Sequence, residues 1–433
     1  MMVPSAVAVR SYQVGFGDCF VIRVMYSNGI ERHVLIDFGS TAFTKMPSQR
    51  NLRDIARHIA KESGGKLAAV VATHRHRDHI SGFDTAGDII EELEPDLVVQ
   101  PWTEDPNLEP DAQAPSAAPE DLALVSSLAN IERFTETLMQ LIDKDRSQKA
   151  ADRQLSPKIR NQLSFLGETN LKNADAVRTL IRLGENAAAG PVWAKYGDQL
   201  PLDEVLPGVK IRVLGPPTVT QWADIRRRRS TDADEFWHLR QRFWEAESRV
   251  GSAGAEADDA TVAAPPFLAR WVIPKIRSIR ENQMLSLVRA LDSALNNTSL
   301  ILLIDVGPVR LLFPGDAQIE NWLYALREAP DAKDNLDLLA AVNLYKVGHH
   351  GSLNATPKTL WGKFNHKTKD ATDPNRLWTV NSTRANVHGR SSAGTEVPRN
   401  TLIQALKTST NYHTTQKQRR KDAFFHDIEL PTA

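Results

Sequence analysis

This chain of 433 residues has a single cysteine, Cys19. A single thiol excludes an internal disulfide and fits a reducing compartment. Cys19 lies in an apolar run that is typical of a strand, which predicts a buried side chain rather than a reactive thiol. We therefore expect a cytoplasmic protein.

The chain also lacks an excess of charge and a long apolar run. It has 53 basic and 53 acidic residues, so no global field draws it to nucleic acid or to an anionic membrane. Its start has no basic leader ahead of an apolar stretch, and no window approaches the ~20 apolar residues of a membrane span. We expect a soluble protein with no membrane partner. The net charge of zero does not decide whether the surface has a local basic groove.

The order of predicted elements indicates an α/β (α+β) fold. Residues 6–38 are predicted to form a strand meander, and a helix at 51–63 begins an alternation of strands and helices. Two segments, 103–185 and 220–294, break this alternation and space their apolar residues as helices do. We expect a single domain over 1–433 in which these largely helical insertions cap the active site. The alternative is that they enlarge the core.

The segment richest in chemistry follows a predicted buried strand at 67–72 and packs three histidines and an aspartate into six residues. Strand alternation would send His74 and His76 to the same side. A following turn would bring in Asp78 and His79 from another direction. Such imidazole and carboxylate ligands suit two divalent metal ions, Zn²⁺ or Mn²⁺, with Fe as a further choice. A polar loop with surface histidines is the alternative.

This His-x-His-x-Asp-His string resembles the signature of the metallo-β-lactamase superfamily, whose fold is an αββα sandwich. The resemblance implies that Asp37, at the end of an early predicted strand, orients a ligand histidine. It also implies that Asp316 bridges both metals and that His350 is the last ligand. The implied ligands are His74, His76 and Asp316 for the first ion, and Asp78, His79, His350 and the shared Asp316 for the second.

Three further places narrow the resemblance to one branch. They are the Gly-Phe-Gly-Asp-Cys turn at 15–19, the strand entry at 296–300 and the His-His-Gly-Ser at 349–352. All three look like the soluble hydrolase domain of the ComEC DNA-uptake proteins and are similar to bacterial phosphorylcholine esterases. The matching blocks frame about residues 6–100 and 295–410, and most of the segment between them is unmatched.

The resemblance also implies roles for three residues beyond the ligands. Many superfamily members have a third histidine where this chain has Asn297, so Asn297 is expected behind the first ion, which should be held more weakly. His349 is expected to face the substrate and donate to a phosphoryl oxygen, or else to be a structural histidine bonded to backbone. His388 lies where related domains carry a late histidine, and its part in the site is open. The candidate catalytic residues are Asp78, His349 and His388.

Two metal ions that share an aspartate and a solvent molecule lower the pKa of that water from ~15.7 towards ~7. The resulting hydroxide attacks carbon or phosphorus, and no serine or cysteine nucleophile is needed. The ComEC-like blocks favour a phosphodiesterase or nuclease acting on a phosphoester, with nucleic acid among the candidate substrates. Basic runs at 226–229 and 416–421 are candidate phosphate contacts, or else solvated faces.

Two other classes of function stay open. One is a hydrolase of a small molecule, such as a choline phosphoester, a cyclic nucleotide or a lactone, because superfamily members use the same ligands for all these reactions. The other is a regulatory or interaction role with a vestigial metal site, against which the complete ligand set argues. The sequence does not indicate a protein partner.

Overall fold

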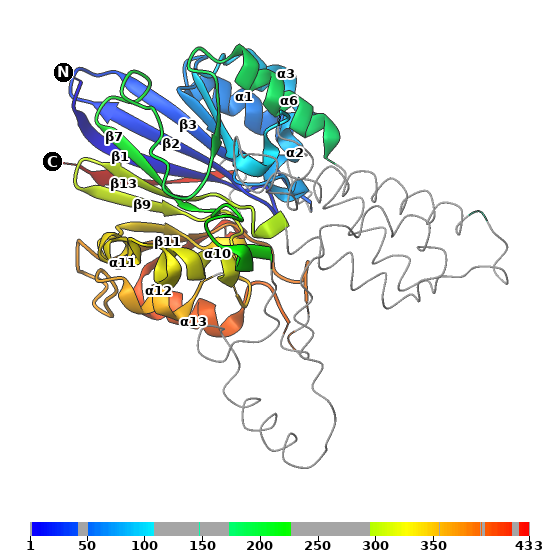
Figure 1. The fold of residues 1–433 in the computed structure, drawn as a ribbon. Coiled ribbons are helices and arrows are strands. Elements are labelled where there is room, and N and C mark those ends of the chain that lie inside the picture. The colour runs from blue at the N-terminus through cyan, green and yellow to red at the C-terminus, as the bar shows by residue number, and fades with distance from the viewer. Residues whose placement is uncertain are drawn as a thin grey trace.

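The computed structural model describes residues 2–41, 51–107, 173–226, 295–354, 356–389, 395–417 and 424–432, together with residues 147 and 391. Within these ranges the chain forms two β-sheets that face each other, and helices cover the outer face of each sheet (Figure 1). The described part is therefore a mixed α/β structure, in agreement with the predicted fold class.

The first sheet has seven strands in the order β13-β1-β2-β3-β4-β5-β6. Neighbours from β13 to β3 are antiparallel, whereas β3, β4, β5 and β6 are parallel. The predicted meander at 6–38 is confirmed as β1 to β3, and Cys19 is buried in it, as expected. The strands are β1 (Pro4–Tyr12), β2 (Cys19–Tyr26), β3 (Glu31–Phe38), β4 (Ala69–Val71), β5 (Leu97–Pro101), β6 (Pro191–Ala194) and β13 (Phe425–Pro431).

The second sheet has six strands in the order β12-β11-β10-β9-β8-β7. Strands β7, β8 and β9 are antiparallel, and β9 to β12 are parallel. Parallel strands end at the same edge of a sheet, so the loops after β9, β10 and β11 lie together. The strands are β7 (Val209–Gly215), β8 (Ile301–Val306), β9 (Val309–Phe313), β10 (Leu344–Lys346), β11 (Trp378–Asn381) and β12 (Asn411–Thr414).

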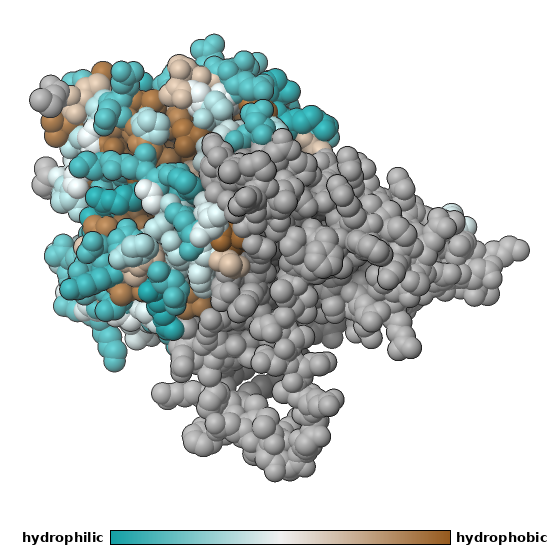
Figure 2. Space-filling model, in the orientation of Figure 1, coloured by the Kyte–Doolittle hydropathy of each residue, from teal (hydrophilic) through white to brown (hydrophobic). Residues whose placement is uncertain are grey.

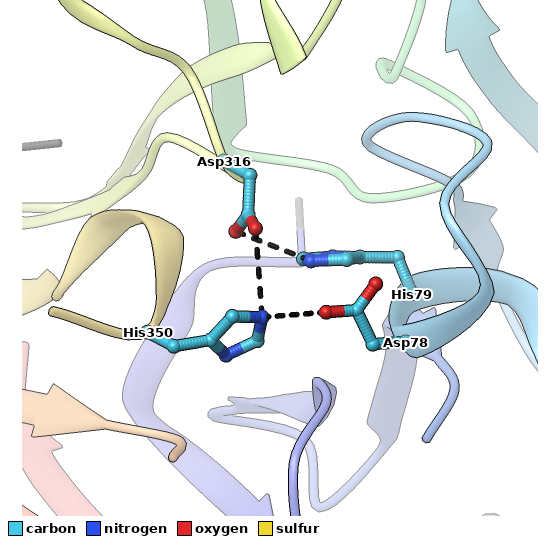
Figure 3. A group of neighbouring side chains, drawn as sticks. All are labelled: Asp78, His79, Asp316 and His350. Atoms are coloured by element: carbon cyan, nitrogen blue, oxygen red, sulfur yellow. Dashed lines mark hydrogen bonds and ion pairs between the residues drawn. The ribbon is translucent and has the colours of Figure 1, made fainter. Parts of the chain in front are cut away.

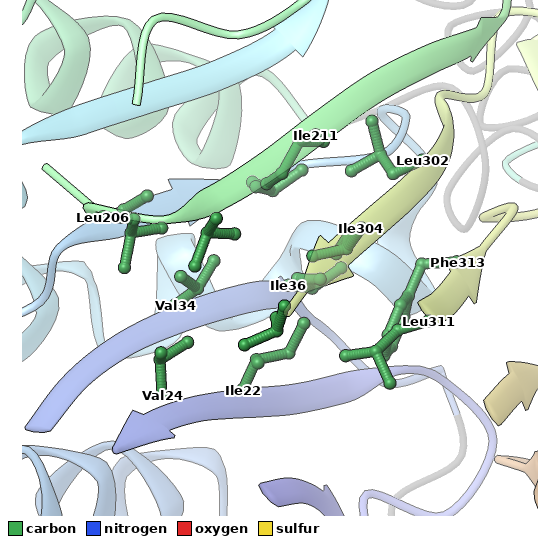
Figure 4. Packing of buried hydrophobic residues seen from close by; sticks show 14 of the residues in the cluster. Ile22, Val24, Val34, Ile36, Leu206, Ile211, Leu302, Ile304, Leu311 and Phe313 are labelled. Carbon is green, nitrogen blue, oxygen red and sulfur yellow. The ribbon is translucent and has the colours of Figure 1, made fainter. Parts of the chain in front are cut away.

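The space between the sheets is filled by aliphatic side chains that alternate along the strands (Figure 4). Ile22 and Val24 of β2 meet Leu302 and Ile304 of β8 in this cluster, as strand period two requires. Phe313 of β9 also lies in this cluster. Burial of each such side chain stabilises the fold by about 1.5–3 kcal/mol. This apolar layer therefore contributes to the stability of the sandwich.

Two helical layers complete the structure. Helices α1 (Leu52–Glu62), α2 (Arg77–Thr85), α3 (Gly87–Glu91) and α6 (Ala174–Asn186) pack on the first sheet through one hydrophobic cluster. Helices α10 (Ile319–Leu323), α11 (Ala332–Ala340), α12 (Lys358–Lys363) and α13 (Asn400–Ser409) cover the second sheet through another, with the π-helix η6 (Tyr324–Glu328). Short 3-10 turns lie at η1 (Trp102–Glu104), η4 (Ala223–Arg226), η7 (Gly348–Gly351) and η9 (Thr415–Lys417).

The predicted insertions fall mainly outside the described residues. The end of the first one is an exception, because α6 packs on α2 and on the first sheet as part of the helical layer. Most of the basic runs at 226–229 and 416–421 also lies outside the described residues. None of the helices in the described ranges has the length and apolar character that a membrane span requires.

The described surface is mostly polar. On the face drawn in Figure 2, hydrophilic residues predominate and hydrophobic ones show in small groups. Val3 and Ile30 are the large hydrophobic side chains that are exposed among the described residues. Such scattered apolar residues are ordinary on a folded protein and do not indicate a docking surface.

Candidate metal centre

Two aspartates and two histidines converge where loops that follow β9 and β10 meet the start of α2 (Figure 3). Asp78 and His79 lie in the first turn of α2, Asp316 follows β9, and His350 follows β10. Each offers one ligand atom, and these four atoms lie within 4.8 Å of one another. All four side chains are buried. This cluster, here called the four-residue group, can hold a metal ion.

The imidazoles of the four-residue group point their Nε2 atoms at its carboxylates. His350 Nε2 lies 2.9 Å from Asp78 Oδ2 and 3.5 Å from Asp316 Oδ2. His79 Nε2 lies 3.1 Å from Asp316 Oδ1. His350 Nδ1 lies 2.8 Å from the backbone oxygen of Ser382, and a carbonyl can only accept, so Nδ1 carries a proton there. Nε2 is therefore the nitrogen of His350 that is left to bind a cation.

Asp37, at the end of β3, holds His79 from the far side. Asp37 Oδ2 lies 2.7 Å from His79 Nδ1, and it also accepts from the Thr73 hydroxyl at 2.7 Å. Asp37 Oδ1 accepts from the Thr73 backbone N–H at 2.7 Å. The Asp37 backbone is left-handed, with φ 54°, a conformation that a residue with a Cβ rarely adopts. These contacts turn His79 Nε2 toward Asp316. The resemblance implied that Asp37 orients a ligand histidine, and His79 is the histidine that Asp37 contacts.

His74 and His76 lie in an irregular loop rather than on a strand. Strand β4 ends at Val71, so the expectation that strand alternation places the two rings is wrong. The chain leaves the sheet because Asp37 binds Thr73 from one side while Leu300 donates its N–H to the Thr73 carbonyl oxygen. The two rings are nevertheless close, with centroids 4.7 Å apart.

The loop brings this histidine pair next to the four-residue group. The His74 ring centroid lies 4.1 Å from that of His79. Within the described residues, however, neither His74 nor His76 belongs to a ligand cluster as tight as the four-residue group. Among the residues that the structure describes, His74 Nε2 is buried without a hydrogen-bond partner. An unsatisfied buried nitrogen destabilises a protein by about 1–3 kcal/mol, which a bound cation would offset.

Neighbouring segments hold the histidine loop in place. Asn173, just before α6, donates its side-chain amide to the Arg75 carbonyl oxygen at 2.7 Å. Arg75 Nε also forms an ion pair of 3.0 Å with the buried Glu104 carboxylate. At Gly39 the end of β3 approaches the start of α2 so closely that a Cβ would lie 2.6 Å from the Arg77 carbonyl oxygen. A glycine is therefore required there for α2 to present Asp78 and His79.

His349 and His388 lie at different distances from the four-residue group. His349 Nε2 lies 3.8 Å from Asp316 Oδ2, and its side chain is 26% exposed, so it borders both the group and solvent. Its backbone is left-handed, with φ 41°, as is that of His350 with φ 52°. His388 is half-buried, and its ring centroid lies 4.5 Å from that of Phe16, which in turn lies 4.3 Å from His350. Phe16 thus contacts both imidazoles.

Asn297 lies in the turn before β8 and is buried. Its Nδ2 donates to Glu320 Oε2 at 3.4 Å, and its backbone oxygen accepts from Asn321 at 3.2 Å. Its Oδ1 is buried without a hydrogen-bond partner among the described residues. The amide oxygen is therefore the atom of Asn297 that remains for a further ligand.

Sequence reasoning missed two buried charges, Asp18 and Lys346. Lys346 Nζ forms an ion pair with the Asp18 carboxylate and lies 3.5 Å from Asp316 Oδ1. Their signal in the sequence is a charged residue within an apolar run, at 14–22 and at 344–347. Charges are rarely buried unless they are paired, so each of these residues indicates that it has a partner of opposite charge. The sequence does not show which residue that partner is.

Carboxylates set the protonation of the four-residue group. Burial lowers the pKa of His79, but the charges of Asp316, Asp37 and Asp18 outweigh it and raise that pKa well above its usual value. Burial also lowers the pKa of His350, and the aspartates raise it above the usual value. These two imidazoles therefore keep their protons to higher pH than an ordinary histidine does, and a metal ion must displace such protons to bind.

The neighbouring imidazoles behave in the opposite way. Burial, together with the charges of His79 and His76, lowers the pKa of His74 well below its usual value. Burial lowers the pKa of His349 to about 4. Both rings are neutral at neutral pH, which is the form in which imidazole binds a metal or donates a single hydrogen bond.

The donor set consists of imidazole nitrogens and carboxylate oxygens in a buried, preformed arrangement. Such donors suit Zn²⁺ and Mn²⁺, and the unpartnered His74 nitrogen and the clustered carboxylates fit a cation. These buried histidines and aspartates can therefore hold metal ions. Comparison with protein-family models and with curated proteins found no match for this chain.

Proposed function

We propose that this protein is a metal-dependent hydrolase of the metallo-β-lactamase superfamily that cleaves phosphoester bonds, as a phosphodiesterase or nuclease. The observation that carries the proposal is the convergence of Asp78, His79, Asp316 and His350 into one buried group. Two facing sheets with helices on both outer faces support the αββα assignment (Figure 1). A vestigial site would not be expected to keep this complete donor set with its supporting hydrogen bonds.

The proposed centre holds two divalent ions, Zn²⁺ or Mn²⁺. The four-residue group would hold one ion, and Asp316 would be shared with a second. This other ion would be bound by His74, His76 and solvent. The short distance between the His74 and His79 rings supports two adjacent positions.

When bound, two such ions supply hydroxide at neutral pH and stabilise the leaving oxygen. The chain's own residues do the positioning. Asp37 keeps His79 oriented, and the Ser382 carbonyl keeps His350 oriented. His349 is neutral, partly exposed and beside Asp316, which supports the proposal that it donates a hydrogen bond to a phosphoryl oxygen. His388, on the other side of Phe16, is a candidate contact for a more distant part of the substrate.

The test uses the full chain loaded with Mn²⁺ or Zn²⁺. It is incubated with single-stranded and double-stranded DNA, with RNA, and with a choline phosphodiester, a cyclic nucleotide and a lactone. Asp78→Asn is the inactive control, and Asp305→Asn, in β8 and outside the ligand set, is the matched control that should keep activity.

Cleavage of a polymer that depends on Asp78 supports the nuclease. Cleavage of a small substrate alone, with the same dependence, moves the assignment to a small-molecule hydrolase. Identical results for the wild type and Asp78→Asn on every substrate would show that the hydrolase proposal is wrong.

A further inference from the structure

A buried lysine stands directly behind the proposed bridging aspartate. Lys346 is the last residue of β10, and its side chain is 2% exposed. Its Nζ donates to the backbone oxygen of Gly315 at 3.0 Å and lies 3.5 Å from Asp316 Oδ1. One ammonium group therefore contacts both the backbone and the side chain of the loop that carries Asp316.

Asp18 holds this lysine and also connects the other loops of the site. Its carboxylate pairs with Lys346 and lies 3.6 Å from His350 Nδ1 and 3.7 Å from His79 Nδ1. Its backbone N–H donates to the Asp78 carbonyl oxygen at 2.8 Å, and its own carbonyl accepts from Gly39 at 2.9 Å. Every segment that supplies the four-residue group thus contacts Asp18 or Lys346.

Stability alone does not account for such a pair. Moving two charges out of water is unfavourable, and well-packed neutral residues of similar size are often as stable. The pair differs from neutral residues in one respect that matters here. It places a positive charge 3.5 Å from Asp316 Oδ1, whereas His350 Nε2 lies 3.5 Å from the other carboxylate oxygen, Oδ2.

We propose that Lys346, held by Asp18, is a positioning residue for Asp316. The ammonium fixes Asp316 Oδ1 and the preceding carbonyl, so the carboxylate cannot turn away from the metal ions. The inference rests on the proposed metal centre and adds to it the residues that keep the bridging ligand in place. The cluster of Asp18, Asp37 and His79 is another group of candidate ligand atoms, but its Asp18 carboxylate already pairs with the ammonium of Lys346.

The decisive variant is Lys346→Met combined with Asp18→Asn, which removes both charges and leaves no unpaired ion buried. We expect its Tm to stay near that of the wild type. We also expect its affinity for Co²⁺, measured by competition with a chromophoric chelator, to fall about 10- to 100-fold, as is typical when the support of a metal ligand is lost. The absorption spectrum of bound Co²⁺ should change as well, because it reports ligand geometry.

The matched control is Asp305→Asn combined with Arg310→Met. This ion pair of 2.6 Å lies near the opposite end of β9 from Asp316. The control should keep both the Co²⁺ affinity and the spectrum. If the Lys346 and Asp18 double variant keeps its Tm and binds Co²⁺ with wild-type affinity and spectrum, the pair is merely structural and the inference is wrong.

A second variant decides the matter if the double variant does not fold. Asp18→Asn retains the backbone bonds to Asp78 and Gly39, and it leaves Asp316 as the carboxylate nearest to the ammonium. Lys346 should then compete with Co²⁺ for Asp316, so affinity should fall and the spectrum change. Unchanged binding contradicts the inference.

The same measurements separate this inference from the proposed function. Failure of the wild type to bind Co²⁺ overturns the metal centre itself, together with everything that rests on it. Tight Co²⁺ binding that weakens in the variants, without hydrolysis of any substrate, overturns the hydrolase and supports the positioning role.

Discussion

The four-residue group and the histidine pair of His74 and His76 lie side by side but differ in charge. The four-residue group has two carboxylates of its own, and Asp18 and Asp37 lie close behind it. The histidine pair lies in a loop, outside any comparably tight cluster among the described residues. The four-residue group therefore attracts protons and cations strongly, whereas the histidine pair offers imidazoles with no carboxylate of its own.

This difference teaches that the two proposed metal positions should not be equivalent. Carboxylates raise the pKa of His79 and His350, while burial and neighbouring imidazoles lower that of His74. A cation in the four-residue group gains from the surrounding negative charge, and its attraction to nearby carboxylates is strong at short range. The position at His74 and His76 depends on Asp316 for its negative charge, so we expect it to be weaker and faster to exchange.

The largest effect is expected from Asp316→Ala, which should abolish the difference between the two positions by emptying both. Asp316 is the one ligand proposed to touch both ions. Its negative charge also reduces the repulsion between two dications that are typically ~3.5–4 Å apart in such sites. Metal-to-protein ratios should fall from two to zero and hydrolysis should cease, while the Tm stays close to that of Asp305→Ala. Two ions still bound to Asp316→Ala would show that the bridging role is wrong.

His350→Ala and His74→Ala should have smaller and unequal effects. His350→Ala removes a ligand from the four-residue group, so the stronger ion should be lost. His74→Ala should keep that ion and lose the weaker one, leaving about one ion per chain and, at most, weak turnover. Elemental analysis after dialysis measures both variants. Equal losses in the two variants would contradict the inequality of the positions.

Asp37→Asn tests the support behind His79 and should weaken binding without removing a ligand. The carboxylate holds His79 Nδ1 at 2.7 Å, and loss of such a contact typically weakens metal affinity by about 10- to 100-fold. The loss should be confined to the ion of the four-residue group. Competition titration against the Asp305→Asn control measures it, and an unchanged affinity would mean that His79 is oriented without Asp37.

A change of pH should alter the affinity while leaving every ligand and its supporting contacts in place. His79 and His350 have raised pKa values, so they stay protonated to higher pH and must lose those protons when a metal ion binds. Affinity at the four-residue group should therefore fall as pH falls, by about tenfold per pH unit for each proton displaced. His74, with its lowered pKa, adds no such dependence near neutral pH. Zn²⁺ titrations at several pH values measure this, and a flat profile would contradict the assigned protonation.

The sequence predicted the helices and strands that depend on the local pattern of apolar residues. The strands of the meander, the helix at 51–63 and the order of the elements follow from the periodicity of apolar residues, and each was found close to its predicted bounds. The clustering of Asp78 and His79 with Asp316 and His350 matches the ligand group that the resemblance implied for one ion.

Contacts between distant segments explain what the sequence did not predict. The periodicity of apolar residues did not indicate that α2 ends at Thr85 and α3 begins at Gly87, where a Cβ would lie 2.8 Å from Thr179 of α6. Strand β4 stops short of His74 because Asp37 and Leu300 bind Thr73. The partner of Lys346 could not be chosen from the sequence because Asp18 lies on a strand entry of the other sheet.

The order in which a ribosome makes this chain bears on when a metal can be loaded. His350 meets Asp78 across 272 residues of sequence, and the last strand, β13, pairs with the first, β1. Until β13 has emerged, β1 exposes an open edge to other chains, which is a risk for aggregation. The four ligands cannot assemble before residue 350 leaves the exit tunnel. A nascent chain therefore lacks this group of four candidate ligands until residue 350 has emerged, and any metal ion that the group holds must bind after that point.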